Sequence, residues 1–184
     1  GHVTLLEPEN EYGYKGTYMG KKKVLTFGAA YQYEPYVVFD DTVTKAAHLH
    51  YKGWTADAFF EYPVEGMGTF TFGSAYEKVD FGDGYQSLHP ELGALGLNGQ
   101  KNGWYAKAGY MLPKHPLQLF GRYENWRFAM LNNVYDQEVE WIGGGANYFV
   151  WEQRLKVTLE ASHMGFEKLG TFSGLQGDNL RTRE

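Results

Sequence analysis

The chain has 184 residues, enough for one domain with a sizeable interior. Its 17 basic and 22 acidic side chains leave no excess of positive charge, which argues against a nucleic-acid partner. No run approaches the roughly 18 apolar residues of a transmembrane helix, and the absence of cysteine excludes disulfides and thiol-bound metals.

Apolar and polar residues alternate with a period of two along most of the chain. In the stretch RLKVTLEAS (154–162), leucine, valine and alanine alternate with lysine, threonine, glutamate and serine. Such alternation predicts strands with one apolar and one polar face. Eight strands are expected, at about 2–8, 23–34, 53–62, 68–79, 103–112, 117–127, 139–151 and 154–164. Most are near the 9–11 residues with which a tilted strand crosses a bilayer.

Short and long connections alternate between these strands. The short ones are PVEGMG (63–68), PKHP (113–116) and EQ (152–153). The long, polar ones lie at about 35–52, 80–102, 128–138 and 165–184. Outer-membrane barrels combine short periplasmic turns with long external loops. We therefore expect residues 1–184 to be a single barrel segment with four external loops; segment 9–22 does not fit, because it is long yet periplasmic by parity.

The apolar stripes of the seven clearest predicted strands contain no charged residue; they take every second position over 25–33, 54–62, 70–76, 104–112, 117–123, 142–150 and 155–161. One stripe reads Trp54, Ala56, Ala58, Phe60 and Tyr62. Several stripes have Tyr or Trp at an end and small or aliphatic residues between. This layout is typical of an apolar band with aromatic girdles at two water interfaces, so these faces are expected to contact lipid.

The opposite faces carry the charged side chains. A mid-strand charge costs about 2–4 kcal/mol on a lipid face, basic ones most, but is stable in a wet lumen. The residues expected to line a pore are Asp57, Glu61, Glu77, Lys107, Arg122, Glu124, Lys156 and Glu160. With Glu34, this face holds six acids and three bases, which favours a general or weakly cation-preferring pore.

Several stretches resemble the family of phosphate-selective porins O and P. They are GTYMGKKKVLTFGAAYQYEP, KGWTADAFFEYPVEG, NGWYAKAGYMLP, LQLFGRYENW and RLKVTLEASHMGFEK. The resemblance covers about residues 1–170 and rests on strand texture. It implies an outer-membrane channel of a Gram-negative bacterium, usually trimeric, with about 16 strands.

Two features depart from that family. About eight strands are predicted here, and the chain ends in GLQGDNLRTRE rather than in a strand with a final aromatic residue. The resemblance therefore implies a piece of a larger barrel, without an N-terminal part and a closing strand. Only five arginines occur, so the family's anion ladder is missing and phosphate specificity is not carried over.

Four local motifs are better explained without a site. His48 and His50 could hold a metal, but a polar loop near the membrane explains them. Asp80 and Asp83, in DFGDG, fit a Gly/Asp turn better than a calcium site. Ser162 and His163 are strand neighbours on opposite faces and cannot act as a catalytic pair. The glycines of WIGGGANYF lie inside a strand and form no phosphate loop.

The sequence thus predicts an all-β antiparallel transmembrane barrel acting as a passive porin in the bacterial outer membrane. We expect no enzymatic activity, catalytic residue, metal or cofactor. The expected partners are outer-membrane lipid, small ions or solutes and two further copies of the chain in a homotrimer, without nucleic acid. Two alternatives stay open: a structural or plugged outer-membrane barrel, and a soluble β-barrel that binds an apolar ligand.

Overall fold

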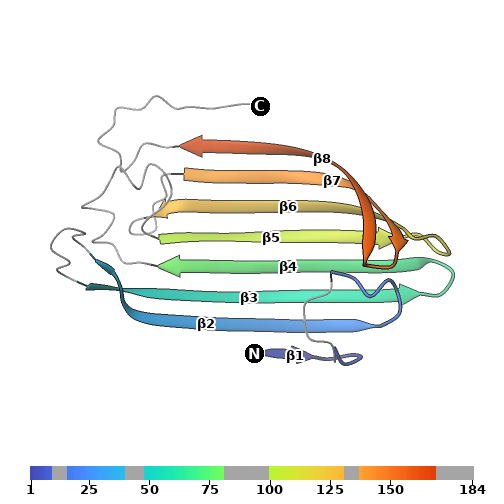
Figure 1. The fold of residues 1–184 in the computed structure, drawn as a ribbon, viewed down its shortest axis with the longest axis horizontal. Coiled ribbons are helices and arrows are strands. Elements are labelled where there is room, and N and C mark those ends of the chain that lie inside the picture. The colour runs from blue at the N-terminus through green and yellow to red at the C-terminus, as the bar shows by residue number, and fades with distance from the viewer. Residues whose placement is uncertain (10–15, 40–47, 81–99, 131–136, 169–184) are drawn as a thin grey trace.

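Eight antiparallel strands form one sheet, in which every strand pairs with its sequence neighbour (Figure 1). The computed structural model describes residues 1–9, 16–39, 48–80, 100–130 and 137–168. The strands are β1 (His2–Thr4), β2 (Val24–Phe39), β3 (His48–Val64), β4 (Gly68–Asp80), β5 (Gln100–Met111), β6 (Leu117–Met130), β7 (Gln137–Trp151) and β8 (Leu155–Lys168). The predicted all-β antiparallel class is confirmed.

Among the described residues, no helix has the length and apolar character needed to cross a membrane.

The short connections form the turns that were predicted. Amide-to-carbonyl hydrogen bonds close them from Met67 to Val64, from His115 to Leu112 and from Arg154 to Trp151. Gly66 takes a positive φ of 74° in the first turn, which a residue without Cβ adopts at little cost. These turns all lie at one end of the sheet, called here the turn end; the other end is the loop end.

The strands extend further toward the loop end than alternation predicts. For example, β3 begins at His48 rather than 53, and β6 ends at Met130 rather than 127. The predicted loops 35–52, 80–102, 128–138 and 165–184 therefore overlap with strands at their margins. Near the loop end both faces carry polar groups, so the alternation fades there. The backbone ladder nevertheless continues. Arg127 and Asn125, for instance, contact Glu138 across β6 and β7.

The first strand is shorter than predicted. Regular pairing covers only His2–Thr4, opposite Gly28–Thr26 of β2. Two more backbone hydrogen bonds, from Leu5 N to Leu25 O and from Glu7 N to Lys23 O, continue beside β2 before Pro8.

The pairing register places all predicted apolar stripes on one face of the sheet. Opposite residues on paired strands share a face, and Phe60 of β3 lies opposite both Leu25 of β2 and Phe72 of β4. The same row continues through Ala108, Gly121, Gly144 and Ala161. A one-residue slip would have turned a strand over. The three register shifts lie near strand ends, at Glu34/Val38, Gln100/Asn102 and Phe149/Trp151.

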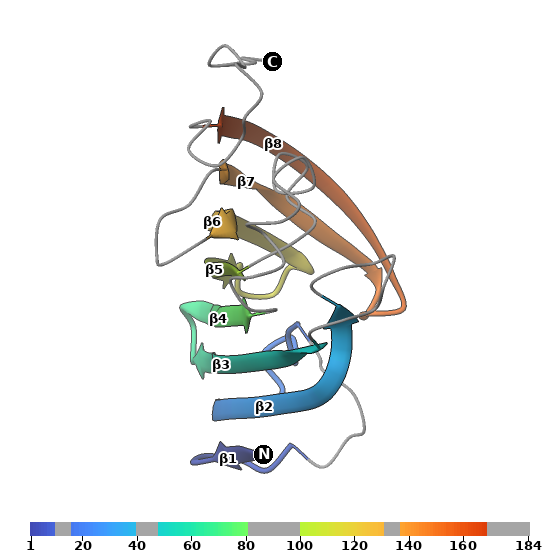
Figure 2. The ribbon, with the colours of Figure 1, turned by 90° about the vertical axis from the view of Figure 1, so that its left-hand side faces the viewer.

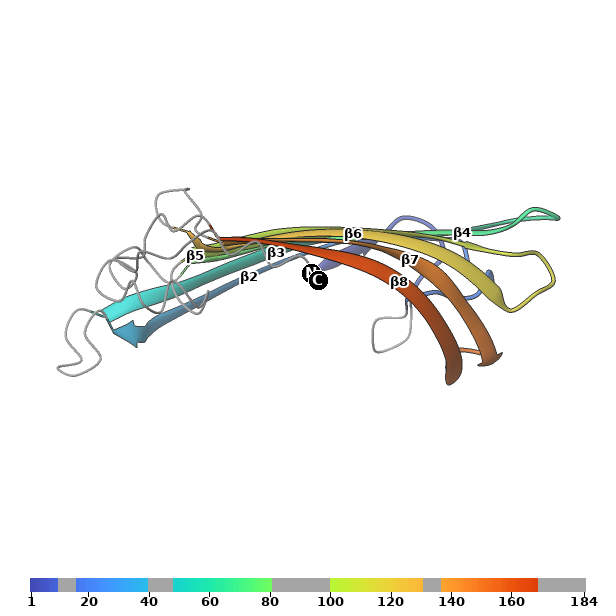
Figure 3. The ribbon, with the colours of Figure 1, turned by 90° about the horizontal axis from the view of Figure 1, so that it is seen from above.

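The sheet is curved and open (Figures 2 and 3). In the described residues β1 and β8 are its two edges and do not pair with each other. The polar face is the concave one, because Phe59 of β3 and Lys156 of β8 line one cavity on that side. Closure into a barrel, which the sequence predicts, is thus not reached by these eight strands.

The apolar face is exposed across the sheet. Large side chains on it remain open to the surroundings, up to 78% for Leu159 and 67% for Tyr31. The buried apolar side chains lie elsewhere, mainly on the concave face, where Phe59 packs with Tyr18 and Val24. The described residues therefore bury their interior on the polar side and leave a broad apolar surface uncovered, which is unusual for a monomer in water.

Substitution of Gly145 tests how closely β7 and β8 approach each other. A Cβ there would lie 2.0 Å from the Leu159 carbonyl oxygen, whereas one at Gly121 would meet nothing nearer than 3.9 Å. We expect Gly145→Ala to lower the free energy of unfolding by about 1–3 kcal/mol. Gly121→Ala should change it by less than about 0.5 kcal/mol. Urea unfolding followed by tryptophan fluorescence measures both, and equal effects would contradict the close approach.

Candidate functional site

All eight residues expected to line a pore share the concave face. The register sets Lys107 opposite Arg122, and Glu124 of β6 lies opposite Tyr105 and Trp141. Asp57 lies opposite Gly28, where its carboxylate occupies the space that a Cβ would need. Glu61, Glu77, Lys156 and Glu160 follow in the same register. The sequence thus identified the shared face correctly, but not which of these side chains interact.

Arg122 is the centre of a charged cluster on β6 and β8. Its Nε lies 2.9 Å from Glu160 Oε1, and one terminal nitrogen lies 3.4 Å from Glu124 Oε1. The Nε–H bond is not directed at the Glu160 oxygen, so this contact is an ion pair rather than a hydrogen bond. The guanidinium also stacks 3.8 Å from the centre of the Trp141 ring. The cluster pairs one arginine with two of the acids on the concave face, so only one of the two negative charges is compensated, and the contacts fix the arginine.

Lys107 and Lys156 differ from Arg122, because neither is ion-paired among the described residues. The Lys107 ammonium lies 4.8 Å from the centre of the Phe120 ring. Both lysines line a cavity of about 310 Å³, in which no acidic side chain takes part. The local charge of this cavity is therefore positive, although the concave face as a whole carries more acids than bases.

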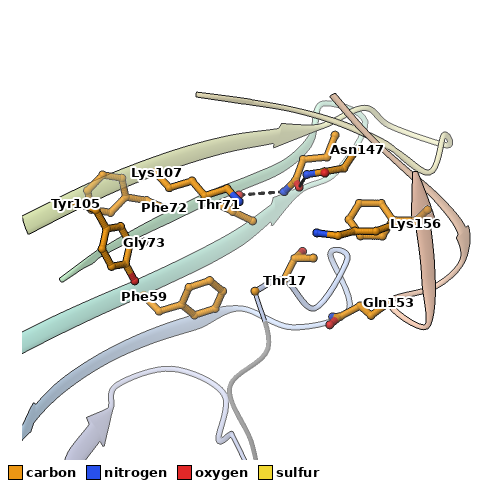
Figure 4. Close-up of a pocket in the computed structure, with 13 residues that line it drawn as sticks. Thr17, Phe59, Thr71, Phe72, Gly73, Tyr105, Lys107, Asn147, Gln153 and Lys156 are labelled. Atoms are coloured by element: carbon orange, nitrogen blue, oxygen red, sulfur yellow. Dashed lines mark hydrogen bonds between the residues drawn. The ribbon is translucent and has the colours of Figure 1, made fainter. Parts of the chain in front are cut away.

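The first two bonds of a chain of side-chain hydrogen bonds cross the floor of the cavity (Figure 4). Gln118 donates to Thr71 at 3.2 Å, Asn147 donates to Gln118 at 3.0 Å, and Thr158 donates to Asn147 at 2.8 Å. The first bond passes over β5 at Gly109, where a Cβ would lie 2.4 Å from the Thr71 hydroxyl. This ladder gives the cavity a rigid, polar floor whose amides are already satisfied.

Residues 16–21, called here the strap, cover part of the concave face near the turn end. Thr17 and Tyr18 are buried although they belong to no strand. Their partner is Glu61, which is 0% exposed and accepts three hydrogen bonds from the strap. Glu61 thus lies on the predicted face, but its carboxylate is shielded from the open concave space. Sequence reasoning missed the strap, because segment 9–22 has no periodicity.

The exposed face shows the layout predicted for lipid contact. Aromatic side chains pair across strands at two levels: Trp54 with Tyr76 toward the loop end, and Phe70 with Tyr110 toward the turn end. Between these levels lie small residues such as Ala58, Ser74, Ala106 and Gly144. Charged side chains on this face reach the loop-end aromatic level, where the Arg127–Glu138 pair lies in the same register row as Trp54.

The local motifs set aside in the sequence form no site in the described residues. The Tyr36 ring lies 5.2 Å from the His48 ring and 5.3 Å from the His50 ring, which makes an aromatic cluster. No group of three His, Cys, Asp or Glu suited to a metal occurs in the described ranges. Ser162 and His163 lie in β8, and Gly143–Gly145 lie in β7. Asp80 ends β4, while Asp83 is outside the described residues.

No protein-family model, curated protein or solved structure matches the chain. The resemblance to phosphate-selective porins therefore stays a prediction, and function is inferred from the two faces of the sheet.

The Arg122–Glu160 ion pair is measurable with a double-mutant cycle of Arg122→Gln and Glu160→Gln. Because these side chains are only 23% and 26% exposed, we expect a coupling of about 0.5–2 kcal/mol in unfolding free energy. Lys21–Glu152, with 65% and 59% exposure, is the control pair, for which about 0.5 kcal/mol or less is expected. A coupling at Arg122–Glu160 no larger than that of the control would show that the cluster does not fix the arginine.

Proposed function

We propose that this sheet is part of the wall of a transmembrane β-barrel porin in the bacterial outer membrane. The exposed face contacts lipid, and the concave face lines a water-filled pore through which ions or small solutes diffuse. No bond is made or broken, and no cofactor takes part.

The observation that carries the proposal is the contrast between the two faces. The exposed face combines uncharged stripes with aromatic side chains at two levels, as described above, and such a surface is stable against hydrocarbon and interfacial water. Asp57, Lys107, Arg122 and Glu160 all lie on the other face. On the lipid side, mid-strand charges would cost about 2–4 kcal/mol each.

The open edges support a barrel with further strands. Unpaired backbone N–H and C=O groups cost several kcal/mol each in hydrocarbon, so a membrane sheet must close. Additional strands next to β1 and β8 complete the wall. A homotrimer of such barrels, as the family resemblance implies, covers part of the exposed face with neighbouring copies.

The charges favour a weak preference for cations over the pore as a whole. Glu34, Asp57 and Glu77 have no ion pair among the described residues, whereas Arg122 is neutralised by Glu124 and Glu160. Lys107 and Lys156 oppose this preference locally at the cavity. The net selectivity is therefore small, and phosphate selectivity is not proposed.

A plugged barrel without conductance is the second candidate, and the strap on the concave face favours it. Single-channel recording of the full-length protein in a planar lipid bilayer with a salt gradient separates the two. We expect stepwise currents and a reversal potential of the sign that cation flow produces. Silence from correctly folded protein would support the plugged barrel, and a reversal potential of opposite sign would contradict the charge argument.

The lipid-facing assignment is tested with single cysteines at neighbouring positions of β8. The chain has no native cysteine, so Lys156→Cys and Val157→Cys each carry one label. We expect brominated lipid chains to quench a fluorophore at position 157 strongly and one at position 156 weakly, because adjacent strand residues face opposite sides. A soluble barrel would show no quenching at either position, and reversed quenching would turn the proposed faces around.

A further inference from the structure

We propose that the strap, residues 16–21, is the constriction of the pore at its turn end, and that Glu61 is the positioning residue that holds it there. This inference rests on the proposed porin function. It assigns the size limit for solutes to a segment that precedes β2, in addition to any contribution from the loops.

Glu61 binds the strap with both carboxylate oxygens. Thr17 donates its hydroxyl and Tyr18 its backbone N–H to Oε2, each at 2.7 Å. Gly20 donates its N–H to Oε1, also at 2.7 Å. Hydrogen bonds to an ionised, buried acceptor are the stronger kind, and their loss leaves backbone donors without a partner. One side chain of β3 thus fixes three of the six strap residues.

Packing gives the strap a defined position over β3 and β4. The Tyr18 ring lies 6.3 Å from the Phe59 ring of β3. Gly20, at φ 75°, lies so near Thr69 of β4 that a Cβ would approach its hydroxyl to 2.4 Å. The strap therefore has little freedom to shift along the sheet while Glu61 holds it.

The far end of the strap reaches across the concave face. Lys21 Nζ lies 2.5 Å from Glu152 Oε1, in the turn between β7 and β8. On a flat sheet β2 and β7 would be about 24 Å apart, at about 4.8 Å per strand spacing. The curvature of the sheet and the reach of the strap together bring Lys21 and Glu152 into contact across this distance.

The strap and the β7–β8 turn bound the same cavity. Thr17 lines it from the strap, Gln153 from the turn, and Lys107 and Lys156 from the sheet (Figure 4). A solute that moves along the concave face toward the turn end meets this cavity. The distance between the strap and β8 sets the width of this cavity, so release of the strap should widen the path of the solute.

The test compares Glu61→Ala with Glu77→Ala in the full-length protein. Both remove one carboxylate from the concave face, but the strap donates its hydrogen bonds to Glu61 and not to Glu77 of β4. We expect Glu61→Ala to raise the single-channel conductance roughly twofold or more, since conductance follows the narrowest section. Glu77→Ala, which removes a pore-lining charge but no strap contact, controls for the loss of charge and should change the conductance far less than Glu61→Ala. Thr17→Val, which removes only one of the three hydrogen bonds, should give a smaller increase and serves if Glu61→Ala does not fold.

Tryptic cleavage in the lysine run 21–23 reports the position of the strap without any current. We expect cleavage of folded Glu61→Ala to be about tenfold faster than that of the wild type, because proteolysis follows local opening. Faster cleavage with unchanged conductance would refute the constriction. Cleavage as slow as that of the wild type in both Glu61→Ala and Thr17→Val would refute the role of Glu61. The absence of single-channel current from the wild-type protein would refute the porin function and the constriction with it. The cleavage rates would still test whether Glu61 holds the strap in place.

Discussion

Strand register is the constraint on which the rest of this structure depends. From β2 to β8 the ladder keeps seven stripes in step, and the shifts that occur lie near strand ends. A slip of one residue in the middle of β5 would carry Lys107 onto the apolar face and Ala106 or Ala108 onto the polar one. Both faces, the charged cluster and the cavity exist only because that slip does not occur.

Much of the fold could be predicted from the sequence, because alternation is a local signal. The existence of eight strands and the shared face of Asp57, Lys107 and Glu160 follow from a period of two, and the short turns follow from the brief, mostly Pro- or Gly-containing breaks between the strands. The strand ends could not be placed, because alternation fades near the loop end while backbone pairing continues, as in the first residues of β3. Closure into a barrel stays a prediction, because β1 and β8 do not pair with each other in the described residues.

The candidate site was predictable in outline but not in detail. Alternation cannot distinguish Arg122, which is ion-paired, from Lys107, which is not, since both occupy equivalent positions on neighbouring strands. Nor can it show that Glu61 is buried. Its partners lie 41 to 44 residues earlier in the chain, in a segment without periodicity. Contacts of that kind depend on three-dimensional packing that a single sequence does not encode in any local pattern.

The two aromatic levels on the exposed face also set the height of the apolar band between them. Trp54 and Tyr62 stand at opposite ends of one stripe, eight positions apart, which is about 27 Å along an extended strand. If the sheet forms the proposed barrel wall, a strand tilt of about 40° would make that length span about 21 Å of membrane thickness. A bilayer of average thickness, about 30 Å, exceeds this value, and the mismatch costs fractions of a kcal/mol for each ångström. Under the proposed lipid-facing assignment, the sheet would therefore suit thin membranes, and a thicker bilayer would have to thin around it.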